Sequence, residues 1–464
     1  MRLYEYGPSI RAFRRFARAS TKKWPVQKLR QLATAAPLQV EKYDIACGIS
    51  GHITVEIHNG FLLRDSPKTP LVIYLPPYPS SPLSPFHPPS WLLSSYPVIN
   101  IPYRWSHDPQ TSFRKQKSHA FPIPLHDTLQ AYSWLLKSYL PSLLPEPKPL
   151  DSNYYYTNPK PVQRPLLIYG SYLGGTLATS LALTESFTSS FLPTNIHSLI
   201  VHNGIFNWTP ISTTPDPSIF RSESSGSSQD LSYNHLSTLD LYERSPWTTL
   251  TLHALKTRLF SSPSQTFDPH ASPILLFRAS GISVPQRWPI PPPDGFSPYP
   301  GPPFQYPDLS NEYVTEEKEE AKEEKEEESH EALAKSKKSK RLFPPANSSL
   351  RIPRSLFTYS PSSFNGNKSH DISQDQKKGK GKKGKKEEKY EDNIFKQQAR
   401  ELTMLMRRSI SKDELGERVQ WDEDCNPEEI AKERVTEMEV GGAGWDGARE
   451  RDTVVREWIV MGGL

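Results

Sequence analysis

The chain has 464 residues, of which 47 are proline, and 35% of its residues are hydrophobic. Globular domains average about 5% proline and about 45–50% apolar residues, so the full length cannot fold as one compact domain. The formal net charge is only +5, because 56 Lys and Arg residues nearly balance 51 Asp and Glu residues. Two cysteines, Cys47 and Cys425, are too few for a disulfide framework. No apolar run approaches the roughly 18 residues of a membrane span, so we expect no transmembrane segment.

The basic residues are concentrated at the N-terminus. Residues 1–40 hold nine Lys or Arg residues and one acid, Glu5, whereas residues 41–310 carry no net charge. Four arginines have the spacing of a single helical face: Arg11, Arg14, Arg15 and Arg18. An amphipathic segment that is rich in arginine and poor in acids is typical of a mitochondrial transit peptide. We therefore predict a targeting segment over 1–40 and a mitochondrial location; the alternative is a basic surface helix or disordered arm on a cytoplasmic protein.

Two insertions are too polar to contribute to a core. Residues 281–349 carry a proline-rich, an acidic and a basic run in succession: Pro285–Pro307, Glu316–Glu328 and Lys335–Arg341. Residues 365–392 include Lys377–Lys386, which consists of seven lysines and three glycines. We expect both insertions to be disordered, because they have too little apolar surface to offset chain entropy. The Lys/Gly tract could bind RNA or another anionic partner, although a solvated expansion is the usual explanation of such a tract.

Between these breaks, short apolar runs alternate with helical patterns. The runs predict strands at His52–His58, Leu71–Leu75, Val98–Pro102, Leu166–Tyr169, Ile196–Val201, Leu356–Ser360 and Arg434–Val440. The helical patterns cover Leu125–Leu140 and Gly175–Phe187. Strands and helices alternating at this spacing predict an α/β fold with a parallel sheet. Leu275–Ala279 is a rival for the penultimate strand, and residues 209–272 are expected to be cap-like or irregular.

The order and local sequences of these segments resemble the α/β-hydrolase family, in its hormone-sensitive-lipase-like ("fold-3") branch. The resemblance runs from Val40 to Trp208 and resumes over 350–464. It is strongest over Pro70–Arg104, Phe121–Leu136 and Pro165–Glu185. It implies a mostly parallel sheet flanked by helices and built from two parts, 41–280 and 350–464, with the insertions between and within them. It also implies a lipase- or esterase-like chain with a nucleophile elbow, an oxyanion loop and catalytic residues in the order Ser…Asp…His.

The expected elbow reads Gly170-Ser171-Tyr172-Leu173-Gly174. In the family the nucleophile stands between two glycines that permit a strained strand-to-helix turn. Gly170 and Gly174 set that register, which places Tyr172 at the nucleophile position and makes Ser171 an alternative one residue early. A phenol with a pKa near 10 is a poor acyl acceptor at neutral pH. The alternative interpretation is a tight turn that the glycines permit and that serves packing alone.

The other catalytic devices of the family are also missing from the sequence. The oxyanion loop after Leu71–Leu75 should supply backbone N–H donors, but it begins Pro76-Pro77-Tyr78, and proline has no N–H. The turn after Leu356–Ser360 contains no acid. The loop after the last strand, where the histidine should stand, offers only Trp445 or Asp446, and no histidine follows His370.

A substitute base would have to come from the upstream histidines. These are His52, His58, His87, His107, His119, His126, His197 and His202. His202 is the least implausible of them, because it directly follows the strand after the elbow. Asp127 is expected to stabilise a helix terminus.

We therefore predict a degenerate α/β-hydrolase-fold protein that acts by binding, with a small ester or lipid-like ligand in the former cleft. The first alternative is a carboxylesterase or lipase-like enzyme that uses residues outside the family pattern. The second is an RNA- or ribosome-associated protein that works through Lys377–Lys386. We expect no cofactor and no metal, because the sequence contains no dinucleotide fingerprint, phosphate-binding loop or metal-ligand cluster.

Overall fold

The computed structural model describes only part of the chain. The described residues are 39–79, 87–105, 119–143, 162–189, 192–211, 247, 249–278, 342–345, 348–361, 393–416, 421–422, 426–441 and 445–462. All of them belong to one compact unit, and the second unit, 279–339, lies outside the described residues. The predicted targeting helix and both low-complexity tracts also lie outside them.

Eight strands form one mixed, mostly parallel sheet in the order β1-β2-β4-β3-β5-β6-β7-β8. Their bounds are β1 (Val40–Ala46), β2 (His52–His58), β3 (Leu71–Leu75), β4 (Val98–Asn100), β5 (Arg164–Ser171), β6 (Thr194–His202), β7 (Arg354–Tyr359) and β8 (Val435–Glu439). The β1–β2 and β2–β4 pairs are antiparallel, and all the others are parallel. The predicted α/β class is therefore confirmed, and the segments on either side of the long insertion share one sheet.

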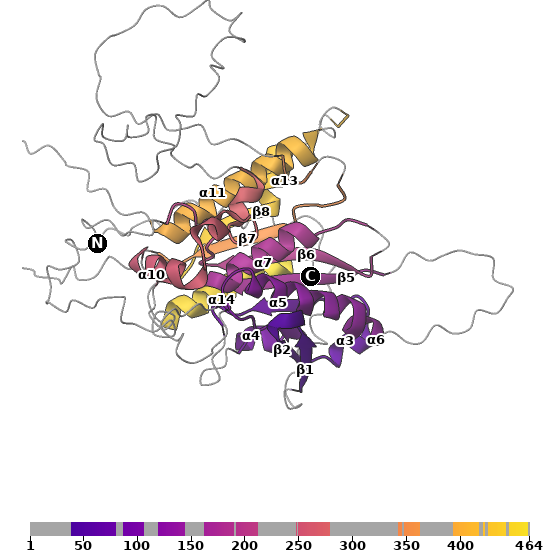
Figure 1. Ribbon diagram of the computed structural model, residues 1–464. Helices are drawn as coiled ribbons and strands as arrows, with labels where there is room; N and C mark the ends of the chain where they lie inside the picture. The colour runs from indigo at the N-terminus through magenta and orange to yellow at the C-terminus, as the bar shows by residue number, and fades with distance from the viewer. Residues whose placement is uncertain are drawn as a thin grey trace, which may run out of the picture. The chain divides into compact units, whose positions relative to one another are not determined.

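The central strands are apolar on both faces because helices cover both faces of the sheet. In β5, Leu166 and Ile168 belong to one core cluster, while Leu167 and Tyr169 belong to the other. The first cluster contains side chains of α5 (Ile123–Trp134), α7 (Tyr172–Glu185) and α11 (Ile394–Ser409). The second contains side chains of α4 (Ser90–Leu93) and α14 (Trp445–Met461). Figure 1 shows α7 and the yellow α14 on opposite sides of the strands.

The remaining helices are α3 (Leu62–Asp65), α6 (Leu140–Ser142), α10 (Thr249–Leu259) and α13 (Pro427–Arg434). No helix among the described residues combines the length and the apolar character that crossing a bilayer requires.

The seven strands expected from apolar runs are present, with ends that differ by a few residues. The rival strand at Leu275–Ala279 is wrong, because residues Pro273–Leu276 form a buried 3₁₀ turn. A five-residue apolar run cannot distinguish a strand from a buried turn by its pattern alone. The helix expected over Leu125–Leu140 is present, but its last part, Leu135–Tyr139, widens into a π-helical turn.

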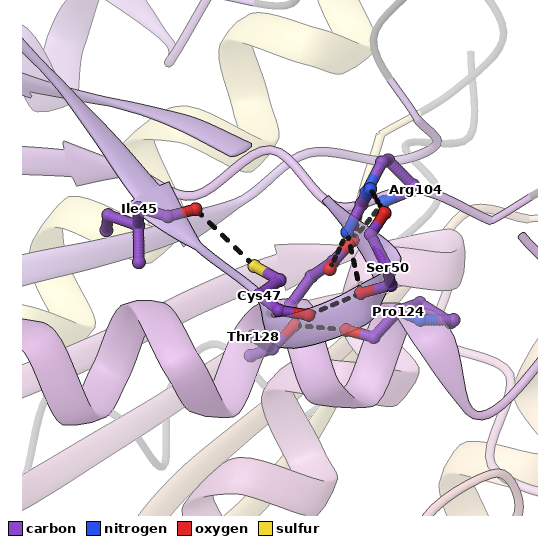
Figure 2. A network of polar contacts seen from close by, with 7 residues as sticks. Ile45, Cys47, Ser50, Arg104, Pro124 and Thr128 are labelled. Atoms are coloured by element: carbon purple, nitrogen blue, oxygen red, sulfur yellow. Dashed lines mark hydrogen bonds and ion pairs between the residues drawn. The ribbon is translucent and has the colours of Figure 1, made fainter. Parts of the chain in front are cut away.

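A charged network connects the turn of the β1–β2 hairpin to the segment after β4 and to α5 (Figure 2). The Asp127 carboxylate, which is fully buried, accepts hydrogen bonds from Nε, Nη2 and the backbone N–H of Arg104. Arg104 also donates to the backbone oxygen of Ser50, and the Ser50 hydroxyl donates to the Cys47 carbonyl oxygen 2.6 Å away. The expectation that Asp127 stabilises a helix terminus is therefore wrong. It is the fifth residue of α5 and neutralises a partly buried arginine.

Candidate functional site

The turn between β5 and α7 has the geometry of a nucleophile elbow. Tyr172 is the first residue of α7 and has a φ of 48°, a left-handed conformation that costs a non-glycine residue about 1–2 kcal/mol. A Cβ atom on Gly174 would lie 2.1 Å from the Pro76 carbonyl oxygen, and one on Gly170 would lie 2.5 Å from the Gly174 carbonyl oxygen. Both glycines are therefore required for the close approach of α7 to β3 and β5.

Ser171, the alternative nucleophile, is the last residue of β5 and not the elbow residue. Its backbone is extended, with φ −139° and ψ 152°, and its side chain makes no capping hydrogen bond to α7. Because side chains alternate along a strand, Ser171 falls on the same face as Tyr169, which packs on the α14 side. The backbone thus places Tyr172, and not Ser171, at the point of the turn.

The backbone N–H that should bind an oxyanion is already engaged. In α/β-hydrolases one of the two donors is the N–H of the residue after the nucleophile, which is Leu173 here. This N–H donates to the Pro77 carbonyl oxygen at 3.0 Å. The neighbouring Pro76 carbonyl oxygen accepts a hydrogen bond from the Tyr103 hydroxyl at 2.9 Å, which fixes the loop in this position. Pro76 and Pro77 therefore provide no N–H groups of their own, and the Pro77 carbonyl oxygen also occupies a donor on the elbow.

Aromatic rings surround the half-buried Tyr172. The Trp247 ring centroid lies 4.7 Å from that of Tyr172, and the Phe395 ring meets it edge-on at 5.7 Å. Tyr78, from the proline loop, lies 6.4 Å from Trp247. These four side chains come from four segments far apart in the sequence, and together they make the space beside the elbow apolar.

A single amide, that of Asn203, connects the polar groups at the elbow. Nδ2 of Asn203 donates to the Tyr172 hydroxyl at 3.2 Å, and it also lies 3.2 Å from Nε2 of His202 and 3.3 Å from the Ser360 hydroxyl. Its Oδ1 accepts from the Ser360 N–H at 2.9 Å. Asn203 has a φ of 49°, a conformation that asparagine tolerates better than most residues. The phenol therefore receives a hydrogen bond where a catalytic base would accept one.

His202 is held neutral, with both ring nitrogens engaged. The Thr358 hydroxyl donates to the Val201 carbonyl oxygen, so it accepts from Nδ1 of His202 at 3.1 Å, and Nε2 is left to accept from Asn203. Burial, with a smaller effect of the Arg451 charge, lowers the pKa of His202 to about 3. The His202 and Tyr172 ring centroids are 6.4 Å apart. Among the described residues, neither Tyr172 nor Ser171 has a hydrogen bond to a histidine.

The positions expected for the acid and the histidine carry other groups. Ser360 follows β7, and its carbonyl oxygen accepts from Nδ2 of Asn393, the N-cap residue of α11, at 2.6 Å. Pro361 is the last described residue of that turn. Trp445 and Asp446 begin α14, but their side chains, like His107, lie outside what the structure describes. Within the described ranges, no group of three His, Cys, Asp or Glu side chains lies close enough to hold a metal ion.

Asn203, Ser360, Asn393 and Trp247 are site residues that the sequence did not point to. Only Asn203 carried a local signal, since Asn203-Gly204 directly after a strand is a turn sequence with a left-handed asparagine. The other three reach the elbow through tertiary contacts from distant segments, and no local pattern marks them.

No family model matches the sequence, and no curated protein matches it. Among solved structures, the chain is similar to carboxyl esterase 2 of the fungus Tuber melanosporum, at 12% identity over 99% of this chain and 97% of that one, with a TM-score of 0.41. It is also similar to an esterase of Pyrobaculum calidifontis, at 19% identity over 58% and 75%, with a TM-score of 0.29. A third is brefeldin A esterase, a bacterial homologue of human hormone-sensitive lipase, at 14% identity over 57% and 61%, with a TM-score of 0.31.

Proposed function

We propose that this chain, which has the α/β-hydrolase fold, has lost ester hydrolysis and acts by binding. The hydrogen bond from the Leu173 N–H to the Pro77 carbonyl oxygen carries the proposal. An oxyanion could reach this donor only if the proline loop moved away. Removing one oxyanion donor typically slows such enzymes by about 10²–10³. The elbow residue here is also a tyrosine, and among the described residues no histidine is hydrogen-bonded to it.

The surroundings of Tyr172 favour an uncharged ligand. Tyr78, Trp247 and Phe395 offer ring faces and edges, and His202 is neutral. The Tyr172 oxygen accepts from Asn203, and its own O–H has no acceptor among the described residues, so it can donate to a carbonyl or ether oxygen. A small ester or a lipid-like molecule combines such an oxygen with an apolar body. We propose that such a ligand would bind without being cleaved.

The test is labelling of the purified chain with a fluorophosphonate probe, together with hydrolysis of p-nitrophenyl butyrate. We expect no labelling and no hydrolysis above that of a Ser171→Ala, Tyr172→Phe double variant. Labelling of the wild type at Ser171 or Tyr172 that the double variant abolishes would contradict the proposal.

A Tyr172→Ser variant tests whether the loop, and not only the nucleophile, blocks catalysis. It places an aliphatic hydroxyl between Gly170 and Gly174 but leaves the Leu173 N–H bonded to Pro77, and it adds no histidine partner from the described residues. We expect it to stay inactive towards p-nitrophenyl butyrate. Turnover well above that of a matched Tyr172→Ala variant would show that the site is intact apart from one residue.

Mitochondrial location and RNA binding depend on segments outside the described residues and are separate proposals. Fusing 1–40 to a fluorescent protein tests targeting, and a diffuse cytoplasmic signal would contradict it. Deleting Lys377–Lys386 tests RNA binding, which should be lost together with its salt dependence if the tract carries it.

A further inference from the structure

A charged residue interrupts the apolar face that α14 presents to the sheet. Val455, Trp458 and Ile459 of α14 are almost fully buried in the second core cluster. Arg451 lies four residues before Val455 and eight before Ile459, so it occupies the same helical face. Its side chain is only 25% exposed. A guanidinium in such a place costs free energy unless it is well paired, so its partners decide what it does.

The pairing of Arg451 is weak. Its Nη2 and Nε lie 3.3 and 3.4 Å from one carboxylate oxygen of the neighbouring residue, Asp452. Strong charge-assisted hydrogen bonds of this kind measure about 2.7–2.9 Å. Arg451 has no other hydrogen-bond partner among the described residues. At least one edge of the guanidinium is therefore available to an anion.

Two tyrosines of the same core cluster stack on each other, and their hydroxyl groups make no hydrogen bond to a described residue. Tyr74 of β3 and Tyr169 of β5 are register partners, and their rings stack with centroids 5.9 Å apart. They are 4% and 3% exposed, yet neither hydroxyl has a hydrogen-bond partner among the described residues. Burial raises the pKa of both phenols, and the nearby charge of Arg451 partly offsets this effect. Both phenols are therefore neutral at physiological pH and can donate.

Trp91 of α4 packs against Tyr169 in the same core cluster. Its ring meets Tyr169 edge-on at 6.0 Å, and its Nε1–H is buried without a hydrogen-bond partner. Native proteins leave few buried polar groups unpaired, and each such group calls for an explanation. Trp91 Nε1–H is such a group. It lies in the same core cluster as the Tyr74 and Tyr169 rings, and the charge of the weakly paired Arg451 acts on both phenols.

We propose that Tyr74, Tyr169 and Arg451 form a binding site for a carboxylate or phosphate group, between the sheet and α14. An oxyanion accepts several hydrogen bonds at once, so it matches two phenol donors and one guanidinium edge. The exposed quarter of Arg451 gives access from the carboxyl edge of the sheet, where α14 begins. This site lies on the side of the sheet away from α7 and does not depend on the proposed loss of ester hydrolysis (Figure 1).

The experiment is isothermal titration of the full-length chain with inorganic phosphate, acetate and octanoate, with sodium chloride as the ionic-strength control. We expect saturable binding of at least one of these anions. Octanoate binding more tightly than acetate would identify a chain-bearing acid as the source of the carboxylate, whereas phosphate binding most tightly would identify a phosphate group. The absence of saturable binding for all three would overturn the proposal.

Tyr74→Phe and Tyr169→Phe locate the site, because each removes a hydroxyl and keeps the stacked ring. We expect each to weaken binding about tenfold or more, since hydrogen bonds to charged groups are among the stronger ones. Arg451→Gln should abolish binding. The matched control is Tyr132→Phe, which removes a buried hydroxyl from α5 on the opposite face of the sheet. An equal loss of affinity in Tyr132→Phe would overturn the assignment.

The stability of the ligand-free variants gives a second readout. Because the Tyr74 and Tyr169 hydroxyls are unpaired in the folded chain, their removal should leave the urea midpoint unchanged or raise it. A large loss of stability would show that these hydroxyls serve the fold, which contradicts the proposal. Ester hydrolysis is measured separately. Hydrolysis would contradict the proposed loss of activity at the elbow, whereas the absence of anion binding would contradict only the proposed anion site.

Discussion

Two polar networks hold junctions of this fold, and they differ in charge. The hairpin network, made of Cys47, Ser50, Arg104 and Asp127, contains a buried carboxylate with a guanidinium bonded to it through two nitrogens. The elbow network, made of Tyr172, His202, Asn203 and Ser360, contains only uncharged groups. An enzyme of this fold needs the opposite at the elbow, where a histidine must take up and release a proton beside a carboxylate that orients it.

The difference shows what each network can do. In the hairpin network every strong donor of Arg104 meets an acceptor, so its function is to hold strands together. The elbow network joins Tyr172, Asn203 and Ser360 through amide and hydroxyl groups, and its histidine, His202, is neutral. Its described groups therefore hold the turn together without a charged side chain.

The largest expected effect comes from breaking the ion pair in the hairpin network. Arg104→Met leaves the fully buried Asp127 carboxylate without its partner, which typically costs about 3–5 kcal/mol. Urea denaturation measures the loss. An Arg104→Met, Asp127→Leu double variant should recover most of it, because no uncompensated charge remains. A single variant that loses less than about 1 kcal/mol would show that the carboxylate has another source of stabilisation.

The second-largest expected effect is a pH dependence of the free energy of unfolding that comes from His202 in the elbow network. An unfolded chain protonates histidine near pH 6.5, whereas the pKa of His202 in the fold is about 3. Between these values the unfolded state binds the extra proton, so the free energy of unfolding falls as the pH falls from about 6.5 towards 3. At pH 5 the contribution lost is about 2 kcal/mol.

The measurement is the free energy of unfolding at pH 7 and pH 5 for the wild type and His202→Gln. The variant lacks this titration, so its stability should fall less between the two pH values. An identical fall in both proteins would mean that His202 is not held neutral by its surroundings.

A smaller effect separates the hydrogen bonds of Asn203 from its backbone conformation. Asn203→Gly keeps the left-handed φ of 49° at little cost but removes the bonds to Tyr172 and Ser360, which should lower stability by about 1–2 kcal/mol. Asn203→Ala removes the same bonds and adds about 1 kcal/mol of backbone strain. Thermal unfolding of both variants measures the two contributions. Equal midpoints would show that backbone strain is not part of the design.

The strands and the elbow turn could be predicted from the sequence, but the partners within the two polar networks could not. The strands and the elbow turn follow from local patterns, since apolar runs such as Leu71–Leu75 and paired glycines such as Gly170 and Gly174 act within a few residues. The partners in each network do not. Arg104 and Asp127 are 23 residues apart, and Asn203 meets Ser360 across the long insertion. A lone aspartate near a helix start therefore suggested a helix-terminus role, although its actual partner lies on another segment.

The last prediction uses Cys47 as a reporter of the hairpin network. Burial, with smaller effects of its polar neighbours, raises the pKa of this thiol to about 11, and the sulfur lies 3.7 Å from the Ile45 carbonyl oxygen. At pH 8 the reactive thiolate fraction is then about 10⁻³, against roughly a quarter for a free thiol. In a Cys425→Ala background, labelling with a disulfide reagent should therefore be slow and should proceed through opening of the hairpin.

Arg104→Met lowers the free energy of that opening. The labelling rate should rise by the factor by which the open-state population rises, because labelling through an open state follows its population. Tyr172→Ser, a change at the elbow, provides the control, and it should leave the labelling rate unchanged relative to global stability. Rapid labelling of the wild-type fold would contradict a closed hairpin network. Equal acceleration by both variants at equal stability would show that the two networks open together as one cooperative unit.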